Sequence, residues 1–189
     1  MVAGPSEICV LADSKTDLNQ VITSMIGQAE HDVNSQCILI TKDKKLVNKL
    51  NIEIKGRIQK VQRKSIVLKS LKNNGLIVLA QSDKQIIEAI NEVAPEHLEI
   101  NVSNYKKYLN QIHNAGSIMI GKYSPMAVSD YNVGTNHVLP TLGSAKFSSG
   151  LNLSEFYKKI SHITLTKKGI EKLGAVSYTH LTLPTIYSV

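Results

Sequence analysis

The sequence predicts an α/β protein built on a doubly wound, mostly parallel sheet. Short apolar runs rich in β-branched residues alternate along the chain with stretches in which apolar residues recur at helical spacing. The strand-like runs are continuously apolar, which indicates a sheet that is buried on both faces. Strands of this kind joined by crossover helices pair in parallel, so we expect helices on both sides of one sheet.

Five segments carry the strand pattern, and helical segments lie between them. The predicted strands are residues 7–12, 36–41, 75–80, 98–102 and 117–120. The predicted helices are residues 18–29, 46–64 and 83–93, with another that begins near Ser103. Strand and helix therefore alternate, as the crossovers of a parallel sheet require.

The regular patterns stop between residues 121 and 150, where Gly, Pro, Ser and Asn are frequent. A polar loop of this length in a compact domain is more often functional than idle. We therefore expect residues 1–150 to form one α/β domain that carries the functional site. The helical patterns of residues 152–159 and 167–173 predict the start of a small helical domain over residues 151–175.

Residues 176–189 differ from the rest of the chain in composition. They contain no Lys, Arg, Asp or Glu, although 20% of the whole chain is charged. The stretch from Val176 to Thr185 is similar to the translation of a transposon-type sequencing adaptor, so we expect a non-native tail that takes no part in the fold. The alternative is a genuine terminal strand.

The net charge of +7 raises the question of a nucleic-acid partner. Only Arg57 and Arg63 are arginines, and arginine is the side chain that makes forked contacts with phosphates and bases. The most basic stretch, residues 42–72, offers few aromatic side chains for stacking. We therefore predict no nucleic-acid partner, and the alternative of a lysine-rich RNA-associated domain would require salt-dependent RNA binding.

The sequence also bears on membranes and on the cellular compartment. No apolar run approaches the roughly 18 residues of a membrane span, and the N-terminus lacks a basic stretch followed by an apolar one. Cys9 and Cys37 both lie inside apolar strand-like runs, which argues against a disulfide scaffold. We expect no membrane partner and a cytoplasmic location.

Gln28 and His31 stand three residues apart at the end of a predicted helix, so their side chains can converge on one ion or substrate group. Taken alone this is a weak metal motif, because Gln is an uncommon zinc ligand and a lone His near a helix end is usually structural. Asp130 lies in the long loop that we expect to cover the strand ends where open α/β sheets bind ligands. Pro95 ends another helix and presents Glu96 and His97, an adjacent acid and imidazole, although this also suits an ordinary helix terminus.

Four motifs, in order and at the right spacing, resemble the signature of the histidinol dehydrogenase family. They are Ala3-Gly-Pro-Ser-Glu7 continuing to Gln28-Ala-Glu-His31-Asp32, then Ala94-Pro-Glu-His-Leu-Glu99, Asn114-Ala-Gly-Ser117, and Asp130-Tyr131 leading to Gly134-Thr-Asn-His-Val-Leu-Pro140. The resemblance covers residues 3–174, and the chain is identified as a member of that family. It implies a Rossmann-like domain in a zinc- and NAD-dependent oxidoreductase of histidine biosynthesis, a homodimer that converts L-histidinol through L-histidinal to L-histidine.

The resemblance also implies roles for single residues. Gln28, His31 and Asp130 match zinc ligands, and together with Ser6, His97 and His137 they match positions that contact the substrate. His97 is expected to be the general base that takes the hydroxyl proton, and Glu96 is expected to activate the water that adds to the aldehyde. In the family, zinc mainly holds and orients the imidazole and amine of the substrate.

Some elements of the family's active site have no counterpart in this sequence. The family's fourth zinc ligand is a His of the other subunit, and we find no matching position. No Gly-x-Gly-x-x-Gly occurs, so we expect no NAD-contacting residue here. We therefore expect an interior-to-C-terminal piece of the enzyme, with an incomplete sheet and no activity by itself. The alternative is a stand-alone α/β module that binds a metal and an imidazole without redox chemistry.

Overall fold

The computed structural model describes residues 4–180 of the chain. The chain divides into two units, residues 1–153 and residues 154–189. Five strands lie in the first unit: β1 (Glu7–Ala12), β2 (Gln36–Thr41), β3 (Gly75–Leu79), β4 (His97–Ile100) and β5 (Ser117–Ile120). They pair in parallel in the order β3-β2-β1-β4-β5. The predicted parallel sheet is confirmed.

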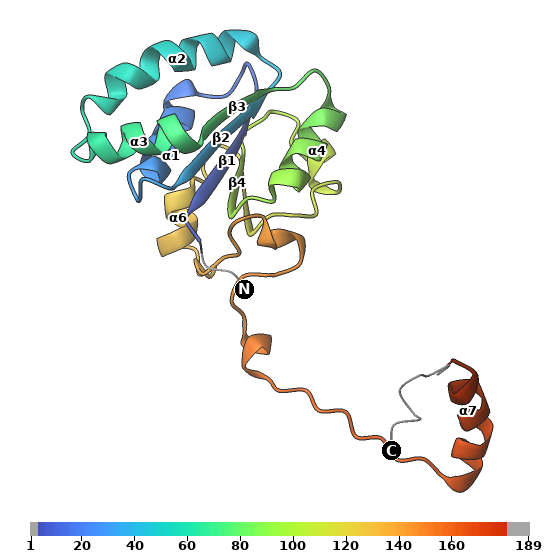
Figure 1. The fold of residues 1–189 in the computed structure, drawn as a ribbon. Coiled ribbons are helices and arrows are strands. Elements are labelled where there is room, and N and C mark those ends of the chain that lie inside the picture. The colour runs from blue at the N-terminus through green and yellow to red at the C-terminus, as the bar shows by residue number, and fades with distance from the viewer. Residues whose placement is uncertain (1–3, 181–189) are drawn as a thin grey trace. The chain divides into compact units, whose positions relative to one another are not determined.

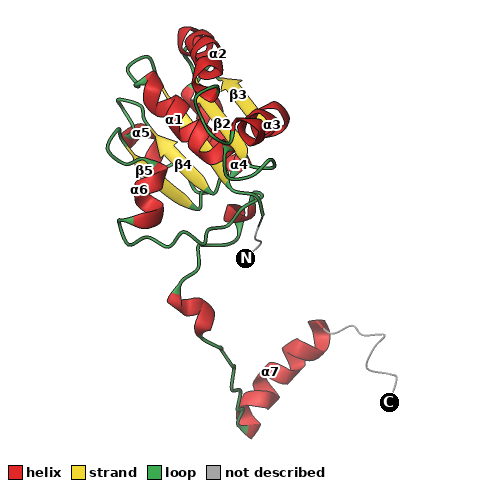
Figure 2. Cartoon of the chain, turned by 90° about the vertical axis from the view of Figure 1, so that its left-hand side faces the viewer, coloured by secondary structure: helices red, strands yellow, loops and turns green. Residues whose placement is uncertain are grey.

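Helices cover both faces of the sheet (Figures 1 and 2). One face carries α1 (Leu18–Ala29), α2 (Lys44–Ile58) and α3 (Lys64–Asn74), and the other carries α4 (Asp83–Val93) and α5 (Lys106–Leu109). Alternate residues of β1 enter two cores: Ile8 and Val10 pack with the first set of helices, and Cys9 and Leu11 pack with the second. The chain leaves β1 and β4 toward opposite faces, so the doubly wound topology switches direction between these two strands.

Local side-chain chemistry sets the ends of the helices. Asp17 accepts the N–H of Asn19 at the start of α1, and Asp43 accepts that of Lys45 at the start of α2. Helix α4 ends at Ala94, whose φ of 48° is in the left-handed region. Pro95 follows and cannot continue a helix, so the chain turns directly into β4.

The prediction of a single helix over residues 46–64 is wrong, because the chain forms α2 and α3 instead. A helix of that length would measure about 28 Å, whereas the six-residue strands measure about 20 Å. The apolar face of α2 ends at buried Ile58, and α3 starts a new axis that buries Val67 and Ser70. The Ser70 hydroxyl donates to the Ser35 carbonyl at 2.8 Å, which fixes α3 beside the start of β2.

The long polar segment is more structured than predicted. Residues 121–150 contain the helix α6 (Met126–Tyr131) and a 3₁₀ turn, Ser144–Lys146, both too short to show a periodic pattern. The helix predicted over residues 152–159 is wrong, since only the 3₁₀ turn Leu153–Phe156 forms. Leu153 and Phe156 are exposed, so burial of an apolar face does not stabilise a longer helix there.

The second predicted helix of this region is present as α7 (Lys167–His180). It begins at the predicted residue and continues beyond the predicted end at Leu173, because no proline interrupts it. Its last residues belong to the segment 176–189, whose remainder lies outside the described residues. The non-native origin of that segment stays a prediction.

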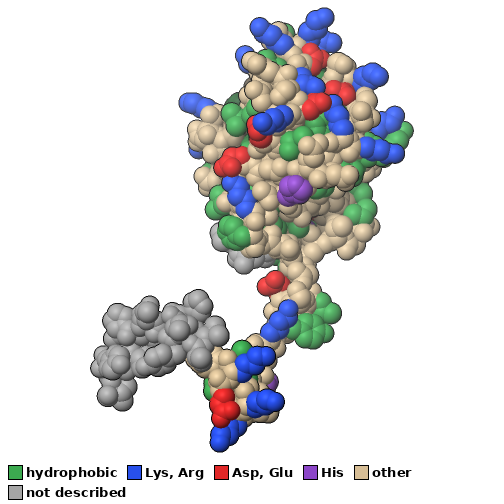
Figure 3. Space-filling view, turned by 90° about the vertical axis from the view of Figure 1, so that its right-hand side faces the viewer, with side chains coloured by type: hydrophobic (Ala, Val, Ile, Leu, Met, Phe, Trp, Pro, Cys, Tyr) green, Lys and Arg blue, Asp and Glu red, His purple; other side chains and the backbone are tan. Residues whose placement is uncertain are grey.

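Charged side chains are distributed over the α/β unit. On the face in Figure 3, Lys and Arg side chains are interspersed with Asp and Glu and do not form one continuous basic patch. No helix in the described region of the chain is both long and apolar enough to cross a bilayer. The absence of nucleic-acid and membrane partners stays a prediction.

Candidate active site

Glu96 and His97 lie at the amino end of the sheet. His97 is the first residue of β4 and pairs in register with Ile8, so Glu7 of β1 lies beside Glu96. The expected position of Asp130, at the strand ends where open α/β sheets bind ligands, is wrong. Helix α6 (Met126–Tyr131) begins beside Glu99, whose carboxylate accepts the Met126 N–H, and it runs toward the amino edge. The Asp130 carboxylate, near the end of α6, therefore lies beside His97.

The His97 imidazole is buried and faces acceptors on both sides. Its Nδ1 lies 3.0 Å from the Glu7 carbonyl and 3.4 Å from Oε2 of Glu96, and its Nε2 lies 3.2 Å from Oδ1 of Asp130. Burial alone would lower the pKa of His97, but the Glu96 and Asp130 carboxylates and the Glu7 carbonyl together raise it above its ordinary value. This arrangement stabilises the imidazolium that forms when the ring takes a proton, and it gives the ring a fixed orientation.

Glu7 is a buried carboxylate that holds the backbone around the pair. Its Oε2 accepts the N–H of Glu96 at 3.2 Å, and its Oε1 accepts the N–H of Leu142 at 2.9 Å. In return the Glu7 N–H donates to Oε2 of Glu96 at 2.8 Å. Burial raises the pKa of Glu7 in spite of these hydrogen bonds. Glu7 therefore fixes both the Glu96 backbone and the segment around Leu142.

Glu99 has a corresponding role further along β4, two residues after His97. It is 0% exposed, and its carboxylate accepts the Ser24 hydroxyl of α1 and, at 2.9 Å, the N–H of Met126 at the start of α6. Burial raises the pKa of Glu99. Sequence reasoning assigned no role to Glu7 or Glu99. The signal was an acid inside an apolar strand, which is rarely buried without partners.

The Ser24–Glu99 hydrogen bond aligns α1 with β4. Gln28 lies one turn beyond Ser24, about 6 Å along the helix toward the amino edge, and His97 lies two residues back from Glu99, about 6.6 Å in the same direction. Gln28 is therefore level with His97 on the same face of the sheet. Its side chain is 1% exposed, and neither Nε2 nor Oε1 has a hydrogen-bond partner among the described residues. A buried amide without partners is costly unless something else binds it.

Comparison with known proteins now identifies the chain. Residues 1–181 match the family model of histidinol dehydrogenase. The chain belongs to the histidinol dehydrogenase family. This confirms the resemblance inferred from the four motifs.

Relatives and a solved structure agree with this membership. The chain is 52% identical over 174 residues to histidinol dehydrogenase of Pelagibacter ubique, and 41% identical over 178 residues to that of Methanocaldococcus jannaschii. These matches cover 92% and 94% of this chain and 41% of each relative. A crystal structure of histidinol dehydrogenase from Elizabethkingia anophelis matches with a TM-score of 0.80 and 37% identity, over 96% of this chain and 42% of that one. The chain thus spans about two fifths of the length of the curated relatives it matches.

The structure gathers some residues of the histidinol dehydrogenase signature more closely than others. Glu96, His97 and Asp130 are in direct contact. His31 is exposed and lies past the end of α1, in a turn where its N–H donates to the Gln28 carbonyl, so the predicted arrangement of both side chains on one regular helix face is wrong. His137 is also exposed, whereas Ser6 is half-buried beside Glu7.

The described residues offer only part of the donor set that a metal site needs. Among the described residues, no group of three or more His, Cys, Asp or Glu side chains is close enough to hold one. The unpartnered amide of Gln28 is a different kind of donor and does fit a ligand, since a bound cation would satisfy its oxygen. Gln28 and Asp130 come from α1 and α6, and both elements bring their ends to the amino edge.

Proposed function

We propose that this chain supplies the substrate-binding and proton-transfer region of a histidinol dehydrogenase, which oxidises L-histidinol through L-histidinal to L-histidine with two NAD. The observation that carries the proposal is the buried His97 imidazole held between the carboxylates of Glu96 and Asp130. A buried imidazole with fixed acceptors at both nitrogens suits proton transfer, and family membership supplies the substrate.

The two ring nitrogens of His97 have different tasks. The Glu7 carbonyl accepts a hydrogen bond from Nδ1 at 3.0 Å, so the proton on that nitrogen stays in place. Nε2 is then the atom that takes the hydroxyl proton as the alcohol loses its hydride. The nearby carboxylates of Glu96 and Asp130 stabilise the imidazolium that results.

Glu96 serves the second oxidation, in which water adds to the aldehyde. Its Oε2 is held by the Glu7 N–H, and no hydrogen bond within the described region of the chain engages its Oε1. Oε1 is therefore the oxygen that takes the proton from water. Because Glu96 follows the left-handed Ala94 and Pro95, its backbone cannot shift without disturbing the end of α4.

We further propose that Gln28, His31 and Asp130 hold zinc, and that Ser6 and His137 contact the substrate. Zinc, when bound, polarises and orients the imidazole and amine of histidinol. NAD, when bound, accepts the hydride, and we expect its contacts and a fourth zinc ligand to come from outside this chain, in a cytoplasmic homodimer. The buried, unpartnered amide of Gln28 supports this assignment.

A chimera tests the proposal. The segment of the Pelagibacter ubique enzyme that matches this chain over 174 residues is replaced by the corresponding segment of this chain. We expect the purified chimera to form NADH with L-histidinol, and His97→Asn to remove at least about 99% of the rate, the contribution typical of a general base. Glu96→Gln should spare the first hydride transfer and block the second.

The 189-residue chain by itself distinguishes the alternatives. We expect it to bind histidinol only in the presence of Zn²⁺ and to form no NADH. Histidinol binding in a chimera that is stable but inactive would favour the binding module without redox chemistry. The retention of full activity by the His97→Asn chimera would show that the base is another residue.

A further inference from the structure

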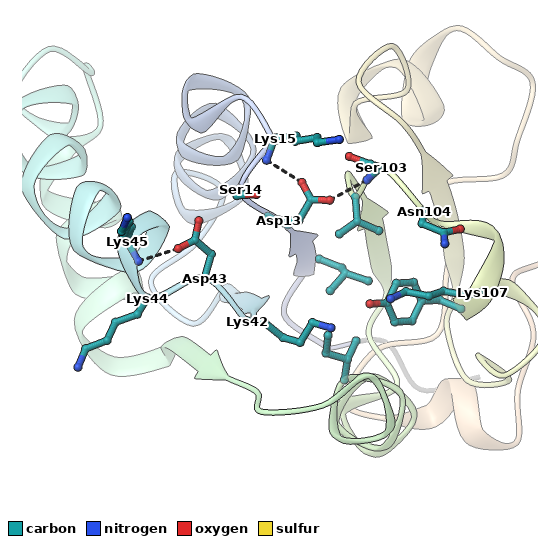
Figure 4. Close-up of a pocket in the computed structure, with 15 residues that line it drawn as sticks. Asp13, Ser14, Lys15, Lys42, Asp43, Lys44, Lys45, Ser103, Asn104 and Lys107 are labelled. Carbon is teal, nitrogen blue, oxygen red and sulfur yellow. Dashed lines mark hydrogen bonds between the residues drawn. The ribbon is translucent and has the colours of Figure 1, made fainter.

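A cavity of about 750 Å³ lies at the opposite edge of the sheet from the candidate active site. It opens at the carboxyl ends of β1, β2 and β4 (Figure 4). This position includes the point between β1 and β4 where the topology changes direction, and parallel α/β sheets bind ligands in the crevice found there. Its volume falls in the range of about 300–1,000 Å³ that is typical of small-molecule sites.

The lining of the cavity combines an apolar wall with ammonium groups. The apolar wall comes from Leu11, Ala12, Ile86, Val102 and the ring of Tyr108. Five lysines, Lys15, Lys42, Lys44, Lys45 and Lys107, and the two acids Asp13 and Asp43 also line it, although the Lys44 side chain points away from the cavity (Figure 4). This composition suits a ligand that has an apolar ring at one end and an anionic group at the other.

Lys42 and Lys107 are positioned in advance by Asp83. Its two carboxylate oxygens lie 2.5 Å from Nζ of Lys42 and 2.6 Å from Nζ of Lys107, and the Tyr108 hydroxyl donates to the same carboxylate at 2.8 Å. The two side chains enter the cavity from different elements and point toward one another (Figure 4). Each ammonium has three N–H donors and gives one to Asp83, so two donors on each remain for an anion on the cavity side of the pair. The two ammonium groups and the Asp83 carboxylate together keep a net charge of +1.

Asp13 determines which portion of a ligand can lie against the turn between β1 and α1. Its carboxylate accepts the N–H groups of Lys15 at 2.9 Å and Ser103 at 2.8 Å, and these bonds lower its pKa although burial alone would raise it. An ionised Asp13 repels phosphate and accepts hydrogen bonds from hydroxyl groups. The turn, residues 13–17, contains no glycine, so a pyrophosphate cannot approach α1 as it does in dinucleotide sites.

We propose that this cavity binds a nucleoside monophosphate, with its phosphate between Lys42 and Lys107, its ribose hydroxyls at Asp13 and its base against Val102 and Tyr108. The site shares no residue with the candidate active site and does not depend on the function proposed there. It also differs from a dinucleotide site, because Asp13 closes the position of the second phosphate.

Titration of the 189-residue chain tests this site, with AMP, adenosine, inorganic phosphate and NAD as probes in isothermal calorimetry. We expect AMP to bind at one site and each of the other three to bind at least about tenfold more weakly. Lys107→Gln, which removes one of the two ammonium groups at the proposed phosphate position, should weaken AMP binding about tenfold. The matched control is Lys72→Gln on the exposed surface of α3, which should leave AMP binding unchanged.

Each contrary result overturns a stated element of the proposal. AMP binding that does not saturate below about 5 mM removes the site. Equal affinities for AMP and adenosine would mean that the lysines do not bind the phosphate. Equal affinities for AMP and inorganic phosphate would mean that the apolar wall does not bind the base. Should Lys107→Gln lower the melting temperature, the parent chain still decides, since equal affinities for AMP and adenosine contradict the proposal.

Discussion

Glu7 and Glu96 hold each other in place, since the carboxylate of each accepts the backbone N–H of the other, at 3.2 Å and 2.8 Å. The exchange joins the amino ends of β1 and β4, two neighbouring strands that are distant in sequence. The Glu7 carbonyl also accepts from Nδ1 of His97. One residue with no predicted role thus orients both members of the proposed catalytic pair.

Removal of the Glu7 side chain should cost stability. Glu7→Ala leaves the buried N–H of Glu96 without its hydrogen-bond acceptor, and the N–H of Leu142 loses its acceptor as well. An unsatisfied buried donor costs about 1–3 kcal/mol, so we expect the free energy of unfolding to fall by at least about 2 kcal/mol in urea titrations followed by circular dichroism. Glu53→Ala, on the exposed side of α2, is the control and should change it by less than about 0.5 kcal/mol. Equal effects of the two substitutions would mean that the exchange is energetically neutral.

Gly116 should not tolerate a side chain. A Cβ there would lie 2.6 Å from the Glu96 carbonyl oxygen, which itself accepts the N–H of Ser117. We expect Gly116→Ala to push β5 away from Glu96, to lower the melting temperature and to reduce the activity of the chimera at least about tenfold. The matched control is Gly27→Ala in α1, where a Cβ meets nothing within 4 Å. It should raise stability by about 0.5–1 kcal/mol, because alanine favours helix. Full activity of Gly116→Ala would show that the backbone of Glu96 can move without loss.

The central strands and most helices could be predicted because burial dictates their sequence, whereas the edge strand β3 keeps an apolar sequence although Leu76 and Leu79 are exposed. Ile8 to Leu11 face two cores in turn, and a continuous apolar run is the direct record of that burial. The division between α2 and α3 could not be predicted in the same way. It depends on the size of the sheet, a tertiary property, whereas the local spacing of apolar residues continues across the turn.

The site could be predicted by residue type but not by position. The motifs identified Glu96, His97 and Asp130, which the structure brings together. Glu96 and His97 lie at the amino edge because β4 begins there. The position of Asp130 beside them depends on the direction of α6, a helix of 6 residues that is too short to be seen as a periodic pattern. Glu7 and Glu99 were missed because a hydrogen bond to a backbone N–H leaves no pattern in the sequence.

Glu99 should make stability depend on pH in a definite direction. Burial raises its folded-state pKa, so its contribution to stability is fully present below its unfolded pKa of about 4.3 and is lost as the pH rises through the folded value. We expect the melting temperature to fall as the pH rises above about 4.3, and to fall less in Glu99→Gln. The neutral amide can donate to Oδ1 of Asn101, which is buried without a partner among the described residues.

Other titrating groups do not obscure that comparison. His97 also has a raised pKa and loses its contribution as the pH rises, but it is present in both chains. Hydrogen bonds from Lys107, Lys42 and Tyr108 hold the pKa of Asp83 well below its ordinary range. Its contribution to stability therefore depends on pH in the opposite direction, and it is lost as the pH falls below about 4. Parallel curves for the parent chain and Glu99→Gln would mean that Glu99 does not titrate in this range.

Gln28 should lower the stability of the metal-free chain and contribute to the binding of zinc. In the metal-free chain its buried amide has no partner among the described residues, so Gln28→Met should raise the free energy of unfolding by about 1 kcal/mol. The same substitution removes a proposed zinc ligand, so the rise in melting temperature on addition of Zn²⁺ should shrink. Gln62→Met, at an exposed position after α2, is the matched control and should change neither quantity. A destabilised Gln28→Met chain with an unchanged response to Zn²⁺ would exclude the amide as a ligand. A stabilised chain that no longer responds would show that the parent chain keeps a costly buried amide because the metal uses it.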